Sequence, residues 1–204
     1  RASSADRAAA RGRGLGAQVR YRQKVGLIMA PHVADYAATL VTGGTQPVIA
    51  CEFLGTATEI VRHLDTAGIP TALFTGANTD TREAERTAFQ RGVKKAIVFT
   101  VCEGINLQAG EAASAASSTP RATLVAEPRW SPIKTLQVEG RAHRDGNVAH
   151  AYYFYAAGTV AERVIKVVTE GMRNVTTLMG ADATPFTGLA AALGVTTLYG
   201  EGPA

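Results

Sequence analysis

Three polar side chains recur at helical spacing in the segment 137–147, which reads QVEGRAHRDGN. Gln137, Arg141 and Arg144 are four and three residues apart, so on a continuous helix they would lie within about 60° of one another. Two planar guanidinium groups on one face can bind phosphate or carboxylate oxygens in a bidentate manner. The spacing therefore predicts either a solvated polar face or a binding site for a group with many negative oxygens.

Apolar runs and helical periodicity alternate along the chain after residue 24. Short apolar runs typical of buried strands lie at residues 47–53, 71–76, 95–101, 122–128 and 150–158. Helical spacing is found at residues 30–41, 56–67, 80–91, from residue 131, and at 160–180. Repeated strand–helix units predict an α/β fold, in which a mostly parallel sheet is covered by helices on both faces.

Local patterns predict where several of these helices begin and end. Thr56 with Glu59, and the acidic pair Asp80 and Glu83, resemble capping boxes at helix N-termini. Gly68 stands where a C-terminal cap belongs.

The segments that follow the predicted strands are candidates for binding. In parallel α/β sheets, ligands bind at the carboxyl ends of the strands. Residues 51–53, 74–76, 100–106 and 127–132 follow four of the strands, and the helix that carries Gln137 starts from the last of these segments. We therefore expect all of these segments, the polar stripe included, to gather at one edge of the sheet.

Composition limits the classes of protein to which the chain can belong. No apolar run approaches the ~20 residues that span a bilayer, no signal peptide is recognisable, and no Cys or His cluster has zinc spacing. Cys51 and Cys102 end apolar runs and are expected to be buried free thiols, which favours a reducing intracellular compartment. We expect no membrane partner.

The chain of 204 residues has a net charge of +4, and its first 24 residues carry seven basic side chains and one acidic side chain. This excess permits a polyanionic partner, but it equally suits a solvated linker from a preceding domain. We expect a basic lead-in at 1–24, a folded domain at 25–181 and an irregular tail at 182–204. Because no initiator methionine is present, we expect the chain to be a piece of a longer or processed polypeptide.

Four segments together resemble the second RecA-like lobe of superfamily 2 helicases and translocases, and in particular the SWI/SNF-type branch with its annealing-helicase relatives. They are RQKVGLIMAPHVADY at 22–36, FTVCEGINL at 99–107, RWSPIKTLQVEGRAHRDGN at 129–147 and GTVAERV at 158–164. The resemblance spans about residues 20–180 and implies a RecA-like parallel sheet flanked by helices.

The resemblance assigns the polar stripe to nucleotide chemistry. It implies that Arg141 and Arg144 act as arginine fingers, which reach the nucleoside triphosphate held by the first lobe and neutralise charge during phosphoryl transfer. It also places Gln137 and, from the segment after the third strand, Glu103, Gly104 and Asn106 near the nucleotide. Val101 and Cys102 depart from the usual family pattern, and the segment could also be a simple strand-to-helix turn.

The resemblance further implies contacts to nucleic-acid phosphates. Thr100 and the turn at Thr75 and Gly76 would bind phosphate through a hydroxyl and backbone amides without reading bases. An ordinary turn at residues 74–76 is the alternative. Trp130 is expected to pack under the following helix, although it could instead face the nucleic acid.

The sequence lacks the parts of a motor that bind ATP tightly. It contains no GxxxxGK[ST] loop and no Asp-Glu pair for magnesium. ATP and Mg²⁺ are therefore expected only in an assembled two-lobe motor, with the N-terminal RecA-like lobe supplied by the parent protein, and the chain alone should be inactive. DNA is the expected track, and the branch favours duplex DNA. The first alternative is a non-catalytic nucleic-acid-binding or interaction module. The second is an unrelated nucleotide-binding enzyme, which would need a glycine-rich loop after the first strand, whereas GRGLG at 12–16 precedes that strand.

Overall fold

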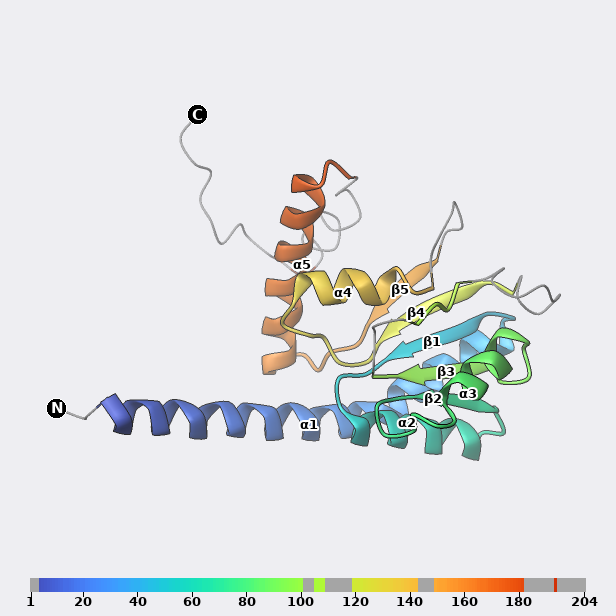
Figure 1. The fold of residues 1–204 in the computed structure, drawn as a ribbon, viewed down its shortest axis with the longest axis horizontal. Helices are drawn as coiled ribbons and strands as arrows, with labels where there is room; N and C mark the ends of the chain where they lie inside the picture. Colours follow the sequence, from blue (N-terminus) through green and yellow to red (C-terminus); the bar gives the residue numbers. More distant parts are fainter. Residues whose placement is uncertain (1–3, 101–104, 109–118, 143–148, 182–192, 194–204) are drawn as a thin grey trace.

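The computed structural model describes residues 4–100, 105–108, 119–142, 149–181 and 193, with side chains described from residue 15 onward (Figure 1). The described residues contain one five-stranded parallel sheet in the order β2-β3-β1-β4-β5. The strands are β1 (Gln46–Ala50), β2 (Thr71–Phe74), β3 (Ala96–Phe99), β4 (Arg121–Val125) and β5 (His150–Tyr153). The helices are α1 (Ser4–Thr42), α2 (Leu54–Thr66), α3 (Arg82–Gln90), α4 (Pro132–Glu139) and α5 (Val160–Leu178).

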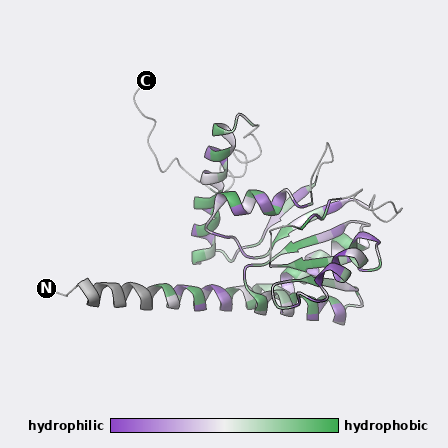
Figure 2. Cartoon of the chain, in the orientation of Figure 1, coloured by the Kyte–Doolittle hydropathy of each residue, from purple (hydrophilic) through white to green (hydrophobic). Residues whose placement is uncertain are grey.

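Helices cover both faces of the sheet, which confirms the predicted α/β architecture. One face packs against α1 and α2, and its core contains Val33, Ile60, Ile49 and Leu124. The other face packs against α3 and α4 around Phe89 and other apolar side chains. Every residue of β1, β3 and β4 is buried, as expected for strands with two covered faces, and Figure 2 shows these strands as largely hydrophobic.

Helix α5 lies outside α4 and is joined to it by close packing (Figure 1). Val164, Val168 and Met172 form a small apolar cluster with Leu136 of α4 and Tyr153 of β5. The helix begins with a cap in which the Thr159 hydroxyl accepts a hydrogen bond from the Ala161 amide. The helical spacing at residues 160–180 predicts this helix, and the structure confirms it.

Helix α1 is longer than the predicted helix at 30–41 and includes most of the expected basic lead-in. By length and composition alone, Leu15–Thr42 would pass as a membrane span. However, Ala30, Val33, Ala34 and Ala37 are buried in the core against α2 and the sheet. The core thus takes up part of the apolar surface of this helix, but only 28% of the membrane-length window is buried, so the expectation of no apolar stretch near that length is wrong here.

Both predicted capping boxes are wrong. Helix α2 begins two residues before Thr56, and its N-cap residue Phe53 makes no side-chain cap bond. The Thr56 hydroxyl donates instead to Glu127, while Glu59 pairs with Arg62 one turn later. Helix α3 likewise begins at Arg82, after the N-cap residue Thr81. Thr56 is thus used by a distant residue, whereas Glu59 and Glu83 pair with arginines three positions later on their own helices. By contrast, Gly68 has a φ of 73° directly after α2, as predicted for a C-terminal cap.

The contact between α4 and α5 depends on the absence of a side chain at Gly171. A Cβ atom there would overlap the ring of Pro132, which cannot move aside as a flexible side chain would. We predict that Gly171→Ala destabilises the domain by about 1–2 kcal/mol, because overpacking outweighs the gain in helix propensity. At Gly55 of α2 a Cβ would meet only Leu27, at 3.9 Å. Gly55→Ala is thus the matched control and should be neutral or stabilising in urea denaturation. Equal effects of the two substitutions would contradict this packing.

Candidate functional site

A buried carboxylate organises the carboxyl edge of the sheet. Glu127 follows β4 and is 6% exposed. Its Oε2 accepts hydrogen bonds from the backbone amides of Glu52 and Phe53, at 2.9 and 3.0 Å, and its Oε1 accepts from the Thr56 hydroxyl at 2.8 Å. These donors belong to the start of α2, so the carboxylate takes the capping role that Thr56 does not perform. Burial raises the pKa of Glu127, although the three bonds oppose that shift.

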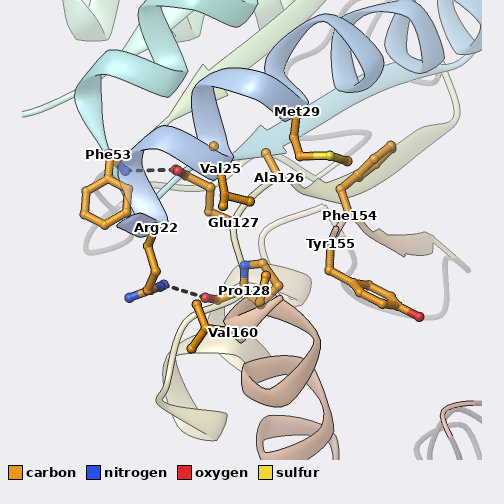
Figure 3. Close-up of a pocket in the computed structure, with 12 residues that line it drawn as sticks. Arg22, Val25, Met29, Phe53, Ala126, Glu127, Pro128, Phe154, Tyr155 and Val160 are labelled. Carbon is orange, nitrogen blue, oxygen red and sulfur yellow. Dashed lines mark hydrogen bonds between the residues drawn. The ribbon is translucent and has the colours of Figure 1, made fainter. Parts of the chain in front are cut away.

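An arginine from α1 binds beside this carboxylate. Arg22 forms an ion pair with Glu52, donates to the Pro128 carbonyl at 2.7 Å, and lies over the ring of Phe53. Figure 3 shows Arg22 directed at Pro128, and Glu127 directed at Phe53. Helix α1, the end of β4 and the start of α2 are thereby joined at one point.

A pocket lies between α1, the end of β4 and the start of α5, and it is lined mainly by apolar side chains such as Met29, Phe154 and Val160 (Figure 3). Its two charged residues, Arg22 and Glu127, are both bonded within the domain. The pocket is therefore mainly apolar, and its two charged side chains are hydrogen-bonded to other residues of the domain.

Arg129 ties the ends of three strands together. It follows β4, and its Nη2 donates to the carbonyls of Cys51 after β1, at 2.7 Å, and Thr100 after β3, at 3.0 Å. The Thr100 amide in turn donates to the Phe74 carbonyl at the end of β2. Thr100 is half-buried at this edge, where the sequence placed it. The predicted burial of Cys51 as a free thiol is confirmed, whereas Cys102 lies outside the described residues.

The turn after β2 is held by its own side chains. Asn78 Oδ1 accepts hydrogen bonds from both the amide and the hydroxyl of Thr75, each at 2.8 Å. Thr75 is 1% exposed, whereas Gly76 is exposed. The Thr75 hydroxyl is thus committed to the turn, and a phosphate contact here would fall to the backbone around Gly76.

The opposite, amino edge of the sheet carries a second cluster around residues 105–108. Arg121, the first residue of β4, is buried, donates to the carbonyls of Leu107 and Gln108, and lies over the ring of Phe89. Its Nη2 also donates to Gln90 Oε1, and Gln90 donates to the Asn106 carbonyl at 3.1 Å. The hydrogen bond from Gln90 to its backbone carbonyl therefore holds Asn106 in position.

Arg141 meets the same segment from the other side. Its Nη1 donates to the Ile105 carbonyl at 2.9 Å, and its own carbonyl accepts from the Leu107 amide. Its Nε is buried and has no hydrogen-bond partner in the described part of the chain. Among the described residues no carboxylate forms an ion pair with Arg141. The guanidinium group therefore keeps its positive charge uncompensated there.

Two expectations about the polar stripe are wrong. Helix α4 ends at Glu139, and its last turn tightens as the Arg141 amide bonds the Val138 carbonyl. Gln137 is exposed on the helix, whereas Arg141 lies beyond its end. Secondly, α4 starts at the carboxyl edge but runs back across the sheet, so Arg141 and Asn106 lie at the amino edge. Thr75, Gly76 and Thr100 lie at the opposite edge.

Three predicted site residues, Glu103, Gly104 and Arg144, lie outside the described residues. Trp130 is 45% exposed, so the prediction that it packs under α4 is wrong. That helix is instead capped by Ser131, whose hydroxyl accepts from the Lys134 amide. No group of three or more metal-binding side chains is found where the structure is described.

Sequence reasoning missed the residues that position both clusters, namely Arg22, Gln90, Arg121, Glu127 and Arg129. A signal was available for two of them, because Glu127 and Arg129 follow an apolar strand at the edge where ligands bind. Arg121 and Gln90 carried no comparable signal, since each reads as an ordinary polar residue at the end of an element.

This architecture is the RecA-like α/β fold of helicase C-terminal domains. The C-terminal part of the Fun30 ATPase domain is similar, with a TM-score of 0.52 and 14% sequence identity, over 63% of this chain and 41% of that chain. The C-terminal domain of S. cerevisiae Dbp5, in a structure with Gle1 and IP6, is similar with a TM-score of 0.50 and 13% identity, over 81% of this chain and 91% of that chain.

The chain thus spans less than half of the Fun30 structure. No protein-family model matches the sequence, and neither does any curated protein. At these identities the likeness establishes the fold, while the activity rests on the site.

We predict that the buried carboxyl group of Glu127 makes stability depend on pH. Its pKa is raised in the folded state, so the folded protein holds this proton more tightly than the unfolded chain. The contribution is favourable below the unfolded pKa and is lost as pH rises through the folded pKa. The free energy of unfolding of the wild type, relative to Glu127→Gln, should accordingly fall as pH rises from below about 4.5 toward neutrality.

Urea denaturation of both proteins at a series of pH values measures this difference, and contributions of other titrating groups cancel in the comparison. Glu59→Gln is the control, because burial does not raise the pKa of that surface carboxyl, which Arg62 instead lowers. If the difference in free energy of unfolding between wild type and Glu127→Gln stays constant across the pH range, Glu127 has the same pKa in the folded and unfolded states and the prediction is wrong.

Proposed function

We propose that this chain is the second, C-terminal motor lobe of an ATP-dependent DNA helicase or translocase. The observation that carries the proposal is Arg141, a guanidinium group without a described acidic partner, fixed against residues 105–107 in a helicase C-terminal fold. A motor lobe must contact both a nucleotide and a nucleic-acid track. The two clusters at opposite edges of the sheet provide separate surfaces for these two tasks.

On the nucleotide side, Arg141 is the described residue that best fits a triphosphate held by another lobe. No carboxylate among the described residues pairs with it, and of its guanidinium donors Nη1 bonds the Ile105 carbonyl, so a γ-phosphate could be bound by the remaining accessible donors. Bound ATP would supply the phosphoryl group, with Mg²⁺ neutralising its charge. We assign Gln137, Asn106, Glu103, Gly104 and Arg144 to the same surface as further contacts.

We infer that magnesium is held by the partner lobe; in the described part of this chain no three metal-binding side chains lie together. We infer that this partner is the N-terminal RecA-like lobe of the same parent protein. A motor of the SWI/SNF-type, working inside the cell, is the branch that the sequence motifs favour.

On the nucleic-acid side, we assign phosphate contacts to the carboxyl edge at Thr100 and at the turn of Thr75 and Gly76. Gly76 is exposed, and exposed backbone amides bind phosphates without reading the sequence. The Thr75 hydroxyl stabilises the turn that presents this backbone. Such contacts suit a motor that steps along duplex DNA irrespective of base sequence.

We predict that Arg141→Ala in the full-length parent lowers ATP turnover by about 10³ or more, the scale of arginine fingers. Turnover is measured with and without duplex DNA, and DNA should stimulate the wild type. Arg141→Lys should recover little activity, because lysine cannot form a bidentate contact. Arg62→Ala, at a surface ion pair on α2, is the matched control and should retain turnover.

Since Arg141 also holds Ile105, the melting temperature of each variant separates lost chemistry from lost structure. A stable Arg141→Ala variant with unchanged turnover would refute the assigned role. A parent that lacks a GxxxxGK[ST] loop and any DNA-stimulated turnover would instead support a non-catalytic nucleic-acid-binding module.

A further inference from the structure

The N-terminal half of α1 extends beyond the body of the domain. Helix α1 runs antiparallel to the strands, and among its residues from Leu15 onward, where burial is described, the first buried one is Gly26. Arg22 bonds Glu52 and Pro128 at the carboxyl edge, so the residues before it continue outward from that edge (Figure 1). From Ser4 to Arg22 the helix extends by about 27 Å at 1.5 Å per residue. We call residues 4–24 the α1 arm.

The α1 arm is strongly basic and has little internal compensation. Between Asp6 and Asp35 the sequence contains no acidic residue, yet it contains five arginines and one lysine. Arg22 is used at the carboxyl edge by Glu52. The remaining charges repel one another unless an anion from outside the arm lies close to them.

Three of these positions form a stripe along one side of the arm. Arg13, Arg20 and Lys24 are seven and four residues apart, which places them within about 40° on a helix. The stripe is rotated by roughly 130° from the helix positions that are buried in the core. Consistent with this rotation, Arg20 and Lys24 are exposed.

The stripe has the dimensions of a phosphate-binding surface. It spans about 17 Å along the helix axis, a length over which duplex DNA presents about ten phosphate charges. The arm also leaves the domain at the carboxyl edge, where Thr100 and Gly76 lie. A nucleic acid bound along that edge would therefore pass close to the base of the arm.

The apolar residues of α1 argue against a lipid surface as the partner. Leu15, Val19, Tyr21, Leu27 and Ile28 are all exposed. At 100° per residue they are distributed around the helix instead of forming one wide stripe. An interfacial membrane helix requires a continuous apolar face.

We propose that the α1 arm is an additional nucleic-acid-binding element, in which Arg13, Arg20 and Lys24 bind phosphates next to the carboxyl edge. The inference rests on the proposed function, because that function places nucleic acid at this edge. Three glycines at positions 12, 14 and 16 each disfavour the helix by about 1 kcal/mol relative to alanine. Binding of phosphates along the arm should therefore increase its helicity.

The test is binding of this chain to a fluorescent 30-base-pair duplex, measured by anisotropy over a series of salt concentrations. The triple variant Arg13→Gln, Arg20→Gln, Lys24→Gln should show a salt slope that is less steep by up to about 2.7, or 0.9 for each lost contact. Its affinity at low salt should fall by about tenfold or more.

The matched control removes the same net charge elsewhere, through Arg62→Gln, Arg86→Gln and Lys95→Gln. In the native protein these side chains bond groups on their own or adjoining elements, and none lies on α1. The control variant should keep the wild-type salt slope. Circular dichroism of each protein checks its folding, and helicity should rise with added DNA in the wild type but not in the α1 triple variant.

An unchanged salt slope in a folded α1 variant would overturn the proposal. The proposed function would still stand if Thr100→Ala weakens DNA binding, or if DNA stimulates ATP turnover of the parent, because either result shows contact at the carboxyl edge. Equal losses in both triple variants would also overturn the proposal for the arm, since net charge alone would then explain binding. The proposal would also be overturned if the α1 variant binds DNA normally but no longer binds the upstream lobe. The arm would then be a protein–protein contact.

Discussion

The buried carboxyl group of Glu127 is the contact at which α1, the start of α2 and the end of β4 meet: it accepts hydrogen bonds from residues 52, 53 and 56 and lies against Gly26. A lone buried carboxylate would cost several kcal/mol, and three donors from the start of α2 offset that cost. Gly26 permits α1 to lie directly against this group, since a Cβ there would overlap both Glu127 and Thr56. Together with the hydrogen bond from Arg22 to the Pro128 carbonyl, this contact fixes the direction in which α1 leaves the domain.

The parallel topology separates the two functional surfaces. Each crossover helix starts at the carboxyl edge and returns to the amino edge, so residues at its two ends cannot share a site. Arg129 fixes the loops at the carboxyl edge through backbone carbonyls, whereas Arg121 and Arg141 fix residues 105–108 at the amino edge. In all three cases an arginine donates to backbone carbonyl oxygens and so holds loops in place. This arrangement suits a lobe that contacts a nucleotide and a nucleic acid on separate sides.

Apolar patterning predicted the strands and their parallel arrangement, because the central strands are buried on both faces and read as continuous apolar runs. Thr100 and the turn at Thr75 lie at the carboxyl edge as expected, whereas Arg141 lies at the amino edge. Sequence reasoning failed wherever a polar side chain serves a distant element. Thr56 was read as a local cap but binds Glu127, 71 positions away, and Arg121 gave no sign that it would hold Leu107. Such contacts depend on how elements cross in space, and spacing along one helix cannot reveal them. The prediction that all candidate segments gather at one edge of the sheet was wrong for the same reason.

The central claim is that Arg141 serves a nucleotide held by a partner lobe. A structure of the full-length parent with a γ-phosphate analogue and duplex DNA tests it most directly. The account predicts a nitrogen of the Arg141 guanidinium group within about 3 Å of the analogue, the distance of a charge-assisted hydrogen bond. If the lobes close on the analogue while Arg141 bonds only the Ile105 carbonyl, and no residue of this lobe contacts the nucleotide, the account is contradicted.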